Sequence, residues 1–199
     1  LEDRPPNNVD AYYSERDNLD MPFYIFKLAL EENIARVIVT RSKHSADSHE
    51  CTSHEEGTKI IDPETFPKSD NFYSWAKASY EHMGVVFATG RFGSSVENVY
   101  IRIGAPRSID GEKLHTNQMS CRRHFGAYFS PRDLCQLYTK SIETADIKNV
   151  DGIPHQVFYG ISGNTRAFWS LESAREVVGY APEGDSEQVF ADEIAQYLT

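Results

Sequence analysis

Arg36-Val-Ile-Val-Thr40 is a short run of mostly β-branched residues, and it predicts a buried β-strand. The segment before it, Asn18 to Glu32, has apolar residues at roughly helical spacing, with Pro22 expected near the start of the helix. A helix followed directly by a buried strand is typical of α/β layering. This stretch therefore predicts an α/β fold.

The rest of the chain alternates between predicted helices and strands. Strands are expected at Val96 to Ile103 and at Gln156 to Ile161, and the polar stretch from Ser42 to Asn71 is expected to be a loop. Capping residues, prolines and glycines mark helices from Asp70 to Gly90 or Gly93, Ser130 to Glu143, Ser170 to Gly179, and Ser186 to Leu198. This order predicts a parallel sheet with crossover helices.

The helix that follows Asp70 is expected to bury one apolar stripe. The residues of this stripe are Phe72, Trp75, Ala76, Tyr80, Met83, Val86 and Phe87. Tyr73 and Lys77 flank this stripe.

Length and charge narrow the classes of protein that are possible. A chain of 199 residues with 40% apolar residues can form one sizeable core, so residues 1–199 are expected to form a single domain. The formal net charge of −10 and the pI near 5.1 argue against nucleic-acid binding, which needs clustered Lys and Arg.

Cysteine usage and hydropathy indicate the cellular compartment in which the protein is expected. Cys51, Cys121 and Cys135 are an odd number at irregular spacing, so a reducing compartment is expected. The first residues lack the apolar core of an export signal, and no stretch approaches the roughly 18 apolar residues of a membrane span. We therefore expect a cytoplasmic protein that does not bind membranes.

Tyr73-Ser-Trp-Ala-Lys77 places a phenol and an ammonium group one helical turn apart, on neighbouring positions of one helix face. A neighbouring cation favours the phenolate, which is the form of tyrosine that accepts a proton. The pattern suits a tyrosine base, although a surface pair on an amphipathic helix has the same spacing. The surrounding sequence must decide between these two interpretations.

Ser42 supplies the context. Parallel α/β sheets bind ligands at the carboxyl ends of their strands, and Ser42 follows the first predicted strand. The order strand, Ser42, loop, Tyr73-x-x-x-Lys77, helix, strand resembles the extended short-chain dehydrogenase/reductase family, also called the NAD-dependent epimerase/dehydratase family.

Further segments sharpen this resemblance. They are similar to the branch that contains uronate dehydrogenases and archaeal NAD-dependent glucose-6-phosphate dehydrogenases, from Leu1 to about Phe190. The segments are Arg36 to His44, Tyr100 to Gly104, Val157 to Asn164, Arg166, Trp169-Ser170, Ala174-Arg175 and Gly179-Tyr180.

The resemblance implies a function and a set of site residues. Tyr73 would take the proton of a sugar hydroxyl while hydride leaves the anomeric carbon for NAD or, alternatively, NADP. Lys77 would support the tyrosine and hold the nicotinamide ribose, and Ser42 would orient the reacting oxygen. His44, Arg123 and Asn18 would contact the sugar. A homodimer or a complementing chain is the implied partner, and no metal is implied.

Departures from the family pattern matter as well. No Gly-x-x-Gly-x-x-Gly turn occurs, so the chain resembles only the carboxyl-terminal part of a Rossmann-like sheet, without the first strands and the adenosine site. Ala105 replaces a substrate-binding serine, and Lys43 replaces an asparagine. Arg41 replaces a small residue, and this new charge either blocks a sugar or binds a phosphate.

Three alternatives stay open. The chain could be a non-catalytic remnant that acts as an oligomerisation or partner-binding module, because a short parallel sheet leaves an edge that recruits another chain. A nucleotide-sugar epimerase or dehydratase shares the serine, tyrosine and lysine. A zinc site formed by His44, His49, Cys51 and His54 is disfavoured, because the spacing matches no usual ligand set.

Overall fold

A three-stranded parallel sheet forms the centre of the protein. The computed structural model describes residues 8–43, 60–106 and 118–197. The strands are β1 (Arg36–Ser42), β2 (Glu97–Ile103) and β3 (His155–Gly160), and they lie in the order β1-β2-β3. The α/β class and the parallel sheet predicted from the sequence are confirmed.

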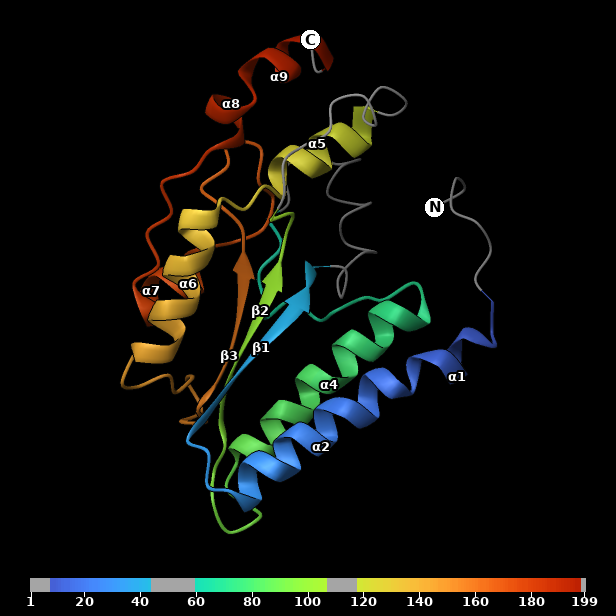
Figure 1. The fold of residues 1–199 in the computed structure, drawn as a ribbon, viewed down its shortest axis with the longest axis vertical. Helices are drawn as coiled ribbons and strands as arrows, with labels where there is room; N and C mark the ends of the chain where they lie inside the picture. Colours follow the sequence, from blue (N-terminus) through green and yellow to red (C-terminus); the bar gives the residue numbers. More distant parts are fainter. Residues whose placement is uncertain (1–7, 44–59, 107–117, 198–199) are drawn as a thin grey trace.

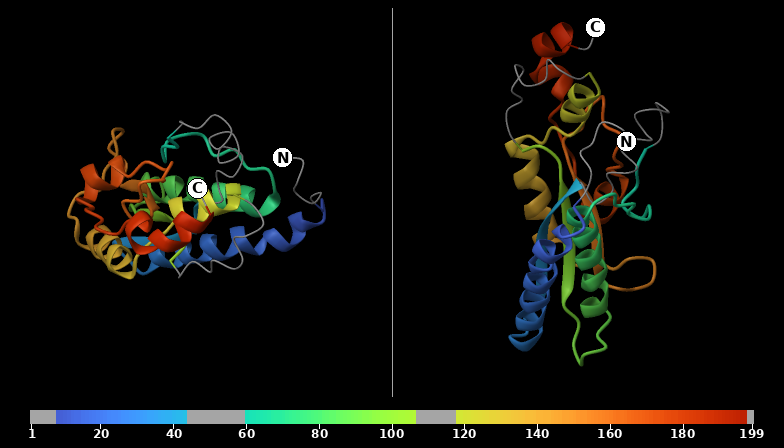
Figure 2. Two further views of the ribbon diagram at one scale, coloured as in Figure 1. Left: turned by 90° about the horizontal axis from the view of Figure 1, so that it is seen from above. Right: turned by 90° about the vertical axis from the view of Figure 1, so that its right-hand side faces the viewer.

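Helices cover both faces of the sheet (Figure 1). One face carries α1 (Ala11–Glu15), α2 (Asp17–Glu31) and α4 (Phe72–Ala88), and α2 and α4 lie side by side (Figure 2). The opposite face carries α6 (Pro131–Glu143) and α7 (Glu172–Val178). Beyond the carboxyl ends of the strands lie α5 (Gln118–Gly126), α8 (Ser186–Val189) and α9 (Ala191–Tyr197).

Alternation along β2 separates the two layers of the core. Val99 and Ile101 point to the α6 and α7 side, where they join the larger buried apolar cluster. Tyr100 points to the other side and packs with Phe26 of α2 and Tyr80 of α4. This two-residue period is what a strand buried on both faces requires.

Polar side chains of β2 hold α4 against the sheet. Asn98 donates a hydrogen bond to the carbonyl of Gly84 (2.9 Å), and the Tyr100 hydroxyl donates to the carbonyl of Tyr80 (2.8 Å). Helix α4 also approaches β2 closely at Gly84, where a Cβ atom would lie only 2.4 Å from Tyr100 Oη. The depth of α4 on the sheet is therefore fixed at two successive turns, those of Tyr80 and Gly84.

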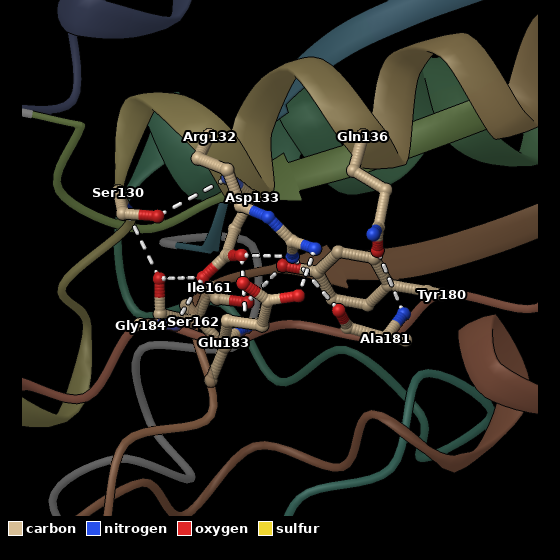
Figure 3. Close-up of polar contacts among 10 residues, drawn as sticks. All are labelled: Ser130, Arg132, Asp133, Gln136, Ile161, Ser162, Tyr180, Ala181, Glu183 and Gly184. Carbon is tan, nitrogen blue, oxygen red and sulfur yellow. Dashed lines mark hydrogen bonds and ion pairs between the residues drawn. The ribbon is translucent and has the colours of Figure 1, made fainter.

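A buried carboxylate ties α6 to the chain segment after α7 (Figure 3). Asp133 accepts hydrogen bonds from the Ser162 hydroxyl (2.6 Å) and from the backbone amides of Glu183 and Gly184 (both 2.9 Å). Burial by itself raises the pKa of Asp133, but these donors and Arg132 offset that effect and lower it to about 2. Each carboxylate oxygen of Asp133 thus accepts two hydrogen bonds.

Several local expectations are corrected by the structure. The side chain that caps α4 is Asn71, which accepts from the Ser74 amide (2.8 Å), and not Asp70, whose carboxylate instead accepts from the Asn71 amide group. Trp75 and Val86 of the expected buried stripe are 37% and 47% exposed. Ser74, Glu81 and Gly84 of α4 are buried instead.

Further differences concern the helices. The single helix expected from Ser186 to Leu198 is divided into α8 and α9 at Phe190, whose ring packs on Phe125 (6.0 Å between ring centroids) and Tyr128 (5.1 Å). The short helices α1 and α5 were not expected, because neither has a clear apolar period. The helix with a Ser130 cap is confirmed, as is the helix that Gly179 ends with φ of 65°.

Candidate active site

A cavity of about 510 Å³ opens at the carboxyl ends of β1 and β2. Its size is within the range of small-molecule sites. Ser42, Tyr73, Lys77 and Arg123, which were predicted from the sequence as site residues, all line it. The other lining residues are Thr40, Arg41, Lys43, Tyr80, Ile103, Gly104, Ala105, Pro106, His124 and Ala127.

Each wall of the cavity comes from a different element. Ser42 is the last residue of β1, and Tyr73 and Lys77 lie in the first turns of α4. The end of α5 is held to the end of β2 by two backbone hydrogen bonds, from the Ala105 amide to the Ala127 carbonyl (2.7 Å) and from the Phe129 amide to the Ala105 carbonyl (3.2 Å). The hydroxyl, the phenol and the cations therefore converge because strand ends and helix starts meet at one edge of the sheet.

Lys77 lies between two phenol rings. Its Nζ atom is 5.2 Å from the ring centroid of Tyr73 and 5.2 Å from that of Tyr80. Burial lowers the pKa of Lys77, the charge of Arg41 lowers it further, and Glu15 acts in the opposite direction. The ammonium group is thus placed beside Tyr73, as the one-turn spacing predicted.

Asn18 reaches the site through Lys77. Its Oδ1 atom accepts a hydrogen bond from Lys77 Nζ (2.8 Å), and its Nδ2 atom donates to Glu15 Oε2 (2.6 Å). Asn18 is not among the residues that line the 510 Å³ cavity. The structure therefore places Asn18 behind the lysine, where it fixes the ammonium group.

The cavity wall is cationic although the whole chain is acidic. Arg41, Lys43, Lys77 and Arg123 line it, and no aspartate or glutamate is among its described lining residues. Lys43 is buried, with Nζ 4.8 Å from the ring centroid of Trp169. A field of one sign in a concave site attracts anions.

A buried ion triad, Arg41–Glu81–Arg102, lies beside the cavity. Glu81 on α4 receives two hydrogen bonds from Arg102 (3.0 and 2.8 Å) and an ion pair from Arg41. Burial by itself raises the pKa of Glu81, but Arg102 and Arg41 outweigh burial and lower it. The sequence reasoning missed Glu81 and Arg102, although two arginines within apolar strands signal a buried acid between them.

Two predictions fall on residues that the structure does not describe. His44, expected to contact a sugar, lies in the range 44–59, and so do the four residues weighed as a zinc site. Among the residues that the structure does describe, no group of three or more His, Cys, Asp or Glu side chains is arranged to hold a metal ion. Cys135 is an exposed free thiol.

A second cavity, of about 930 Å³, lies along another side of α4. Its wall includes Trp75, His82, Arg102 and His155, together with the segment 63–69. It contains none of the predicted site residues, so the chemistry expected from the sequence belongs to the smaller cavity.

Sequence comparisons give two relatives. The chain is 26% identical over 179 residues to an NAD-dependent glucose-6-phosphate dehydrogenase of Haloferax volcanii, and 23% identical over 171 residues to the uncharacterized protein YtbQ of Bacillus subtilis. Each match covers 86% of this chain and 62% of the relative, so the chain spans about three fifths of the length of these proteins. No protein-family model matches the chain.

Structural comparisons give the same type of fold. The uronate dehydrogenase of Agrobacterium tumefaciens superposes with a TM-score of 0.67 at 17% identity, over 90% of this chain and 57% of that enzyme. A UDP-galactose 4-epimerase superposes with a TM-score of 0.59 at 14% identity, over 98% and 76% of the two chains. The resemblance to the extended short-chain dehydrogenase/reductase family is confirmed, and this chain contains part of that Rossmann-like fold.

The hydropathy of the helices gives one more finding. Over the ranges that the structure describes, no helix combines the length and the apolar character needed to cross a lipid bilayer.

Proposed function

We propose that this chain carries the substrate-binding and proton-transfer part of an NAD-dependent dehydrogenase that oxidises a sugar at its anomeric carbon. The observation that carries the proposal is the convergence of Ser42, Tyr73 and Lys77 on one cavity at the carboxyl edge of a parallel sheet. The names of the relatives, an NAD-dependent glucose-6-phosphate dehydrogenase and a uronate dehydrogenase, support the same reaction class.

The residues of the cavity suit the steps of such a reaction. The Ser42 hydroxyl would hold the reacting oxygen of the sugar, and the Tyr73 phenolate would accept its proton. Lys77, fixed by Asn18 and adjacent to the Tyr73 ring, would stabilise the negative phenolate. Arg123 would contribute a forked donor to an acidic group of the substrate.

The nicotinamide end of NAD fits this donor set better than the adenosine end. When bound, NAD supplies the acceptor for the hydride of the sugar carbon. Lys77 would hold the nicotinamide ribose, but the sequence contains no glycine-rich turn to hold a pyrophosphate. We therefore expect this chain alone to bind NAD weakly, and tight stoichiometric binding in calorimetry would contradict that expectation.

Turnover should be measured with NAD in large excess over the protein, because a high cofactor concentration compensates for weak binding. A glucose 6-phosphate or glucuronate solution should produce NADH, detected by its absorbance. Tyr73→Phe should lower the rate by about a hundredfold or more, since the proton acceptor is removed. Tyr13→Phe, a change on the exposed surface of α1, is the matched control and should change nothing. Equal rates for the Tyr73→Phe variant and the unaltered chain would refute the assignment.

The same measurement separates the dehydrogenase from an epimerase. A dehydrogenase accumulates NADH in proportion to the sugar oxidised, whereas an epimerase returns the hydride and leaves NAD oxidised. The fold of the UDP-galactose 4-epimerase shows that this alternative is compatible with the architecture. NAD that stays oxidised while the sugar changes its stereochemistry would favour the epimerase.

An interaction module is the second candidate, because one helix face is exposed and apolar. Met21, Ile25 and Leu28 follow each other at helical spacing on α2 and are 58%, 56% and 54% exposed. Among the described strands, β1 pairs only with β2, so its outer edge is open to another chain.

Sedimentation of the full chain tests this candidate. We expect a dimer or a complex that Ile25→Asp dissociates, because a charge would then be buried in the contact. Val150→Asp, at a fully exposed loop position, is the matched control. A monomer at high protein concentration would speak against the module.

A further inference from the structure

A short chain of hydrogen bonds links the ammonium group of Lys77 to a carboxylate that does not line the cavity. Lys77 Nζ donates to Asn18 Oδ1 (2.8 Å), and Asn18 Nδ2 donates to Glu15 Oε2 (2.6 Å). The direction of this chain is fixed, because an ammonium group can only donate and a carboxylate can only accept. The Asn18 amide therefore presents its oxygen to the cation and its nitrogen to the anion.

Ring contacts hold the helix that carries Glu15 against the helix that carries Lys77. Glu15 is the last residue of α1, and the Tyr12 ring of α1 packs on Phe72 (5.7 Å between ring centroids) and Trp75 (5.8 Å) in the first turns of α4. Because Tyr12 and Glu15 are one helical turn apart, they lie on the same face of α1. The position of Glu15 is therefore set by packing as well as by hydrogen bonds.

The other groups near Lys77 do not favour its charged form as a carboxylate does. Burial is the largest cause and lowers the pKa of Lys77, and the positive charge of Arg41 lowers it further. Glu15 acts in the opposite direction and raises this pKa. Tyr73 and Tyr80 present ring faces to the ammonium group, each with its centroid 5.2 Å from Nζ.

The cavity wall itself supplies no anion that could replace Glu15. Lys43, Arg123 and His124 are further basic side chains that line it, and none of its described lining residues is acidic. The carboxylate that supports the charge of Lys77 thus comes from behind the wall, through the amide of Asn18.

We propose that Glu15 is a positioning residue of this site, which holds Lys77 in its charged form through Asn18 and keeps the ammonium group beside Tyr73. The proposal rests on the proposed function, because a charged Lys77 is what would stabilise a phenolate at Tyr73. Glu15 would contact neither the sugar nor NAD, since it does not line the cavity. It would act on the reaction only through the charge and orientation of Lys77.

The charge of Lys77 can be measured without substrate or cofactor. We would label the lysine side chains of the full chain isotopically and follow, as the pH is raised, the NMR signal that Lys77→Arg removes. Glu15→Gln takes away the negative charge but keeps an oxygen that can accept from Asn18 Nδ2. It should lower the pKa of Lys77 by about half a unit or more, since the ammonium group loses its anionic partner.

Glu31→Gln is the matched control. It removes the same charge from the other end of α2, where Glu31 pairs with Lys27. That end lies roughly 20 Å along the helix from Asn18, well beyond the Debye length of about 8 Å, so the pKa of Lys77 should stay within about 0.2 unit. The indole signal of Trp75, whose ring contacts Tyr12, reports in every variant whether α1 stays on α4.

A second variant keeps the test decisive if Glu15→Gln does not fold, as judged by circular dichroism. Glu15→Ala also removes the accepting oxygen and should lower the pKa of Lys77 at least as much. An unchanged pKa of Lys77 in these variants would overturn the proposal. An equal shift in Glu31→Gln would overturn it too, as would a shift that occurs only together with a displaced Trp75 signal.

Failure of this inference and failure of the proposed function give different results. A pKa of Lys77 that depends on Glu15, without NADH formation from any sugar, would uphold the role of Glu15 and reject the dehydrogenase. NADH formation with a pKa of Lys77 that is indifferent to Glu15 would do the reverse. If both proposals hold, NADH formation should decline at a lower pH in Glu15→Gln than in the unaltered chain, because Lys77 loses its proton earlier.

Discussion

Two buried charges, Asp133 at the start of α6 and Arg41 near the end of β1, differ in how completely they are hydrogen-bonded. Asp133 receives hydrogen bonds on both carboxylate oxygens from Ser162, Arg132 and two backbone amides (Figure 3). Arg41, beside the end of β1, keeps two nitrogen atoms without partners among the described residues.

This difference in hydrogen bonding indicates how much each charge contributes to stability. A saturated buried charge contributes to stability, because every donor and acceptor around it depends on it. A buried charge that is left partly unsatisfied lowers stability, because its donors have lost water without gaining a full set of partners. The hydrogen bonds of Asp133 hold α6 to the segment after α7, whereas Arg41 is held by one ion pair with Glu81 and by the ring of Tyr80.

The largest expected effect concerns Asp133. Asp133→Ala would leave the Ser162 hydroxyl and the amides of Glu183 and Gly184 without their acceptor. We expect the free energy of unfolding to fall by about 3 kcal/mol, measured by urea denaturation. Asp151→Ala, at an exposed loop position, is the control and should change the value little. A loss below about 0.5 kcal/mol would break the comparison between the two regions.

The pH dependence of stability should be the next effect in size. The pKa of Asp133 is lowered to about 2 in the folded protein, from an ordinary value of 3.8. The carboxylate therefore contributes its full stability above pH 3.8, and this contribution is lost as the pH falls toward 2. Unfolding midpoints measured from pH 5 to pH 2 should fall less steeply for Asp133→Asn. Parallel curves for the two proteins would show that other carboxylates determine the pH dependence of stability.

The smallest effect on stability is expected at Arg41. Arg41→Met leaves Glu81 paired with Arg102 and removes donors that had no partners, so the free energy of unfolding should change by less than about 1 kcal/mol. The same urea experiment measures it. A loss as large as that of Asp133→Ala would show that Arg41 contributes as much to stability as Asp133 does.

Local sequence signals located most of the fold. The β-branched run at Arg36 to Thr40, the Ser130 cap and the left-handed Gly179 act over a few residues, and the structure has the expected element at each. What failed depended on distant contacts. Phe190 interrupts the last helix because it packs on Phe125 and Tyr128, which are more than sixty residues earlier in the chain.

In the candidate site, too, local signals could be recognised from the sequence and distant contacts could not. Ser42, Tyr73 and Lys77 could be found from their order and spacing, and the structure brings them to one cavity. The roles assigned to them, and to Asn18, His44 and Arg123, stay predictions. The environment of Arg41 could not be read from the sequence, because whether its charge is satisfied depends on Glu81 and Arg102, which lie on α4 and β2.

The glycine at position 84 sets the geometry of the cavity from a distance. Since Tyr100 and Asn98 fill the space that any side chain at this position would need, even a single methyl group would push the middle of α4 outward. The helix would then tilt, and the shift of its amino-terminal end would increase the distance between the phenol of Tyr73 and the hydroxyl of Ser42. A chain altered only there would retain every reactive group and lose their alignment.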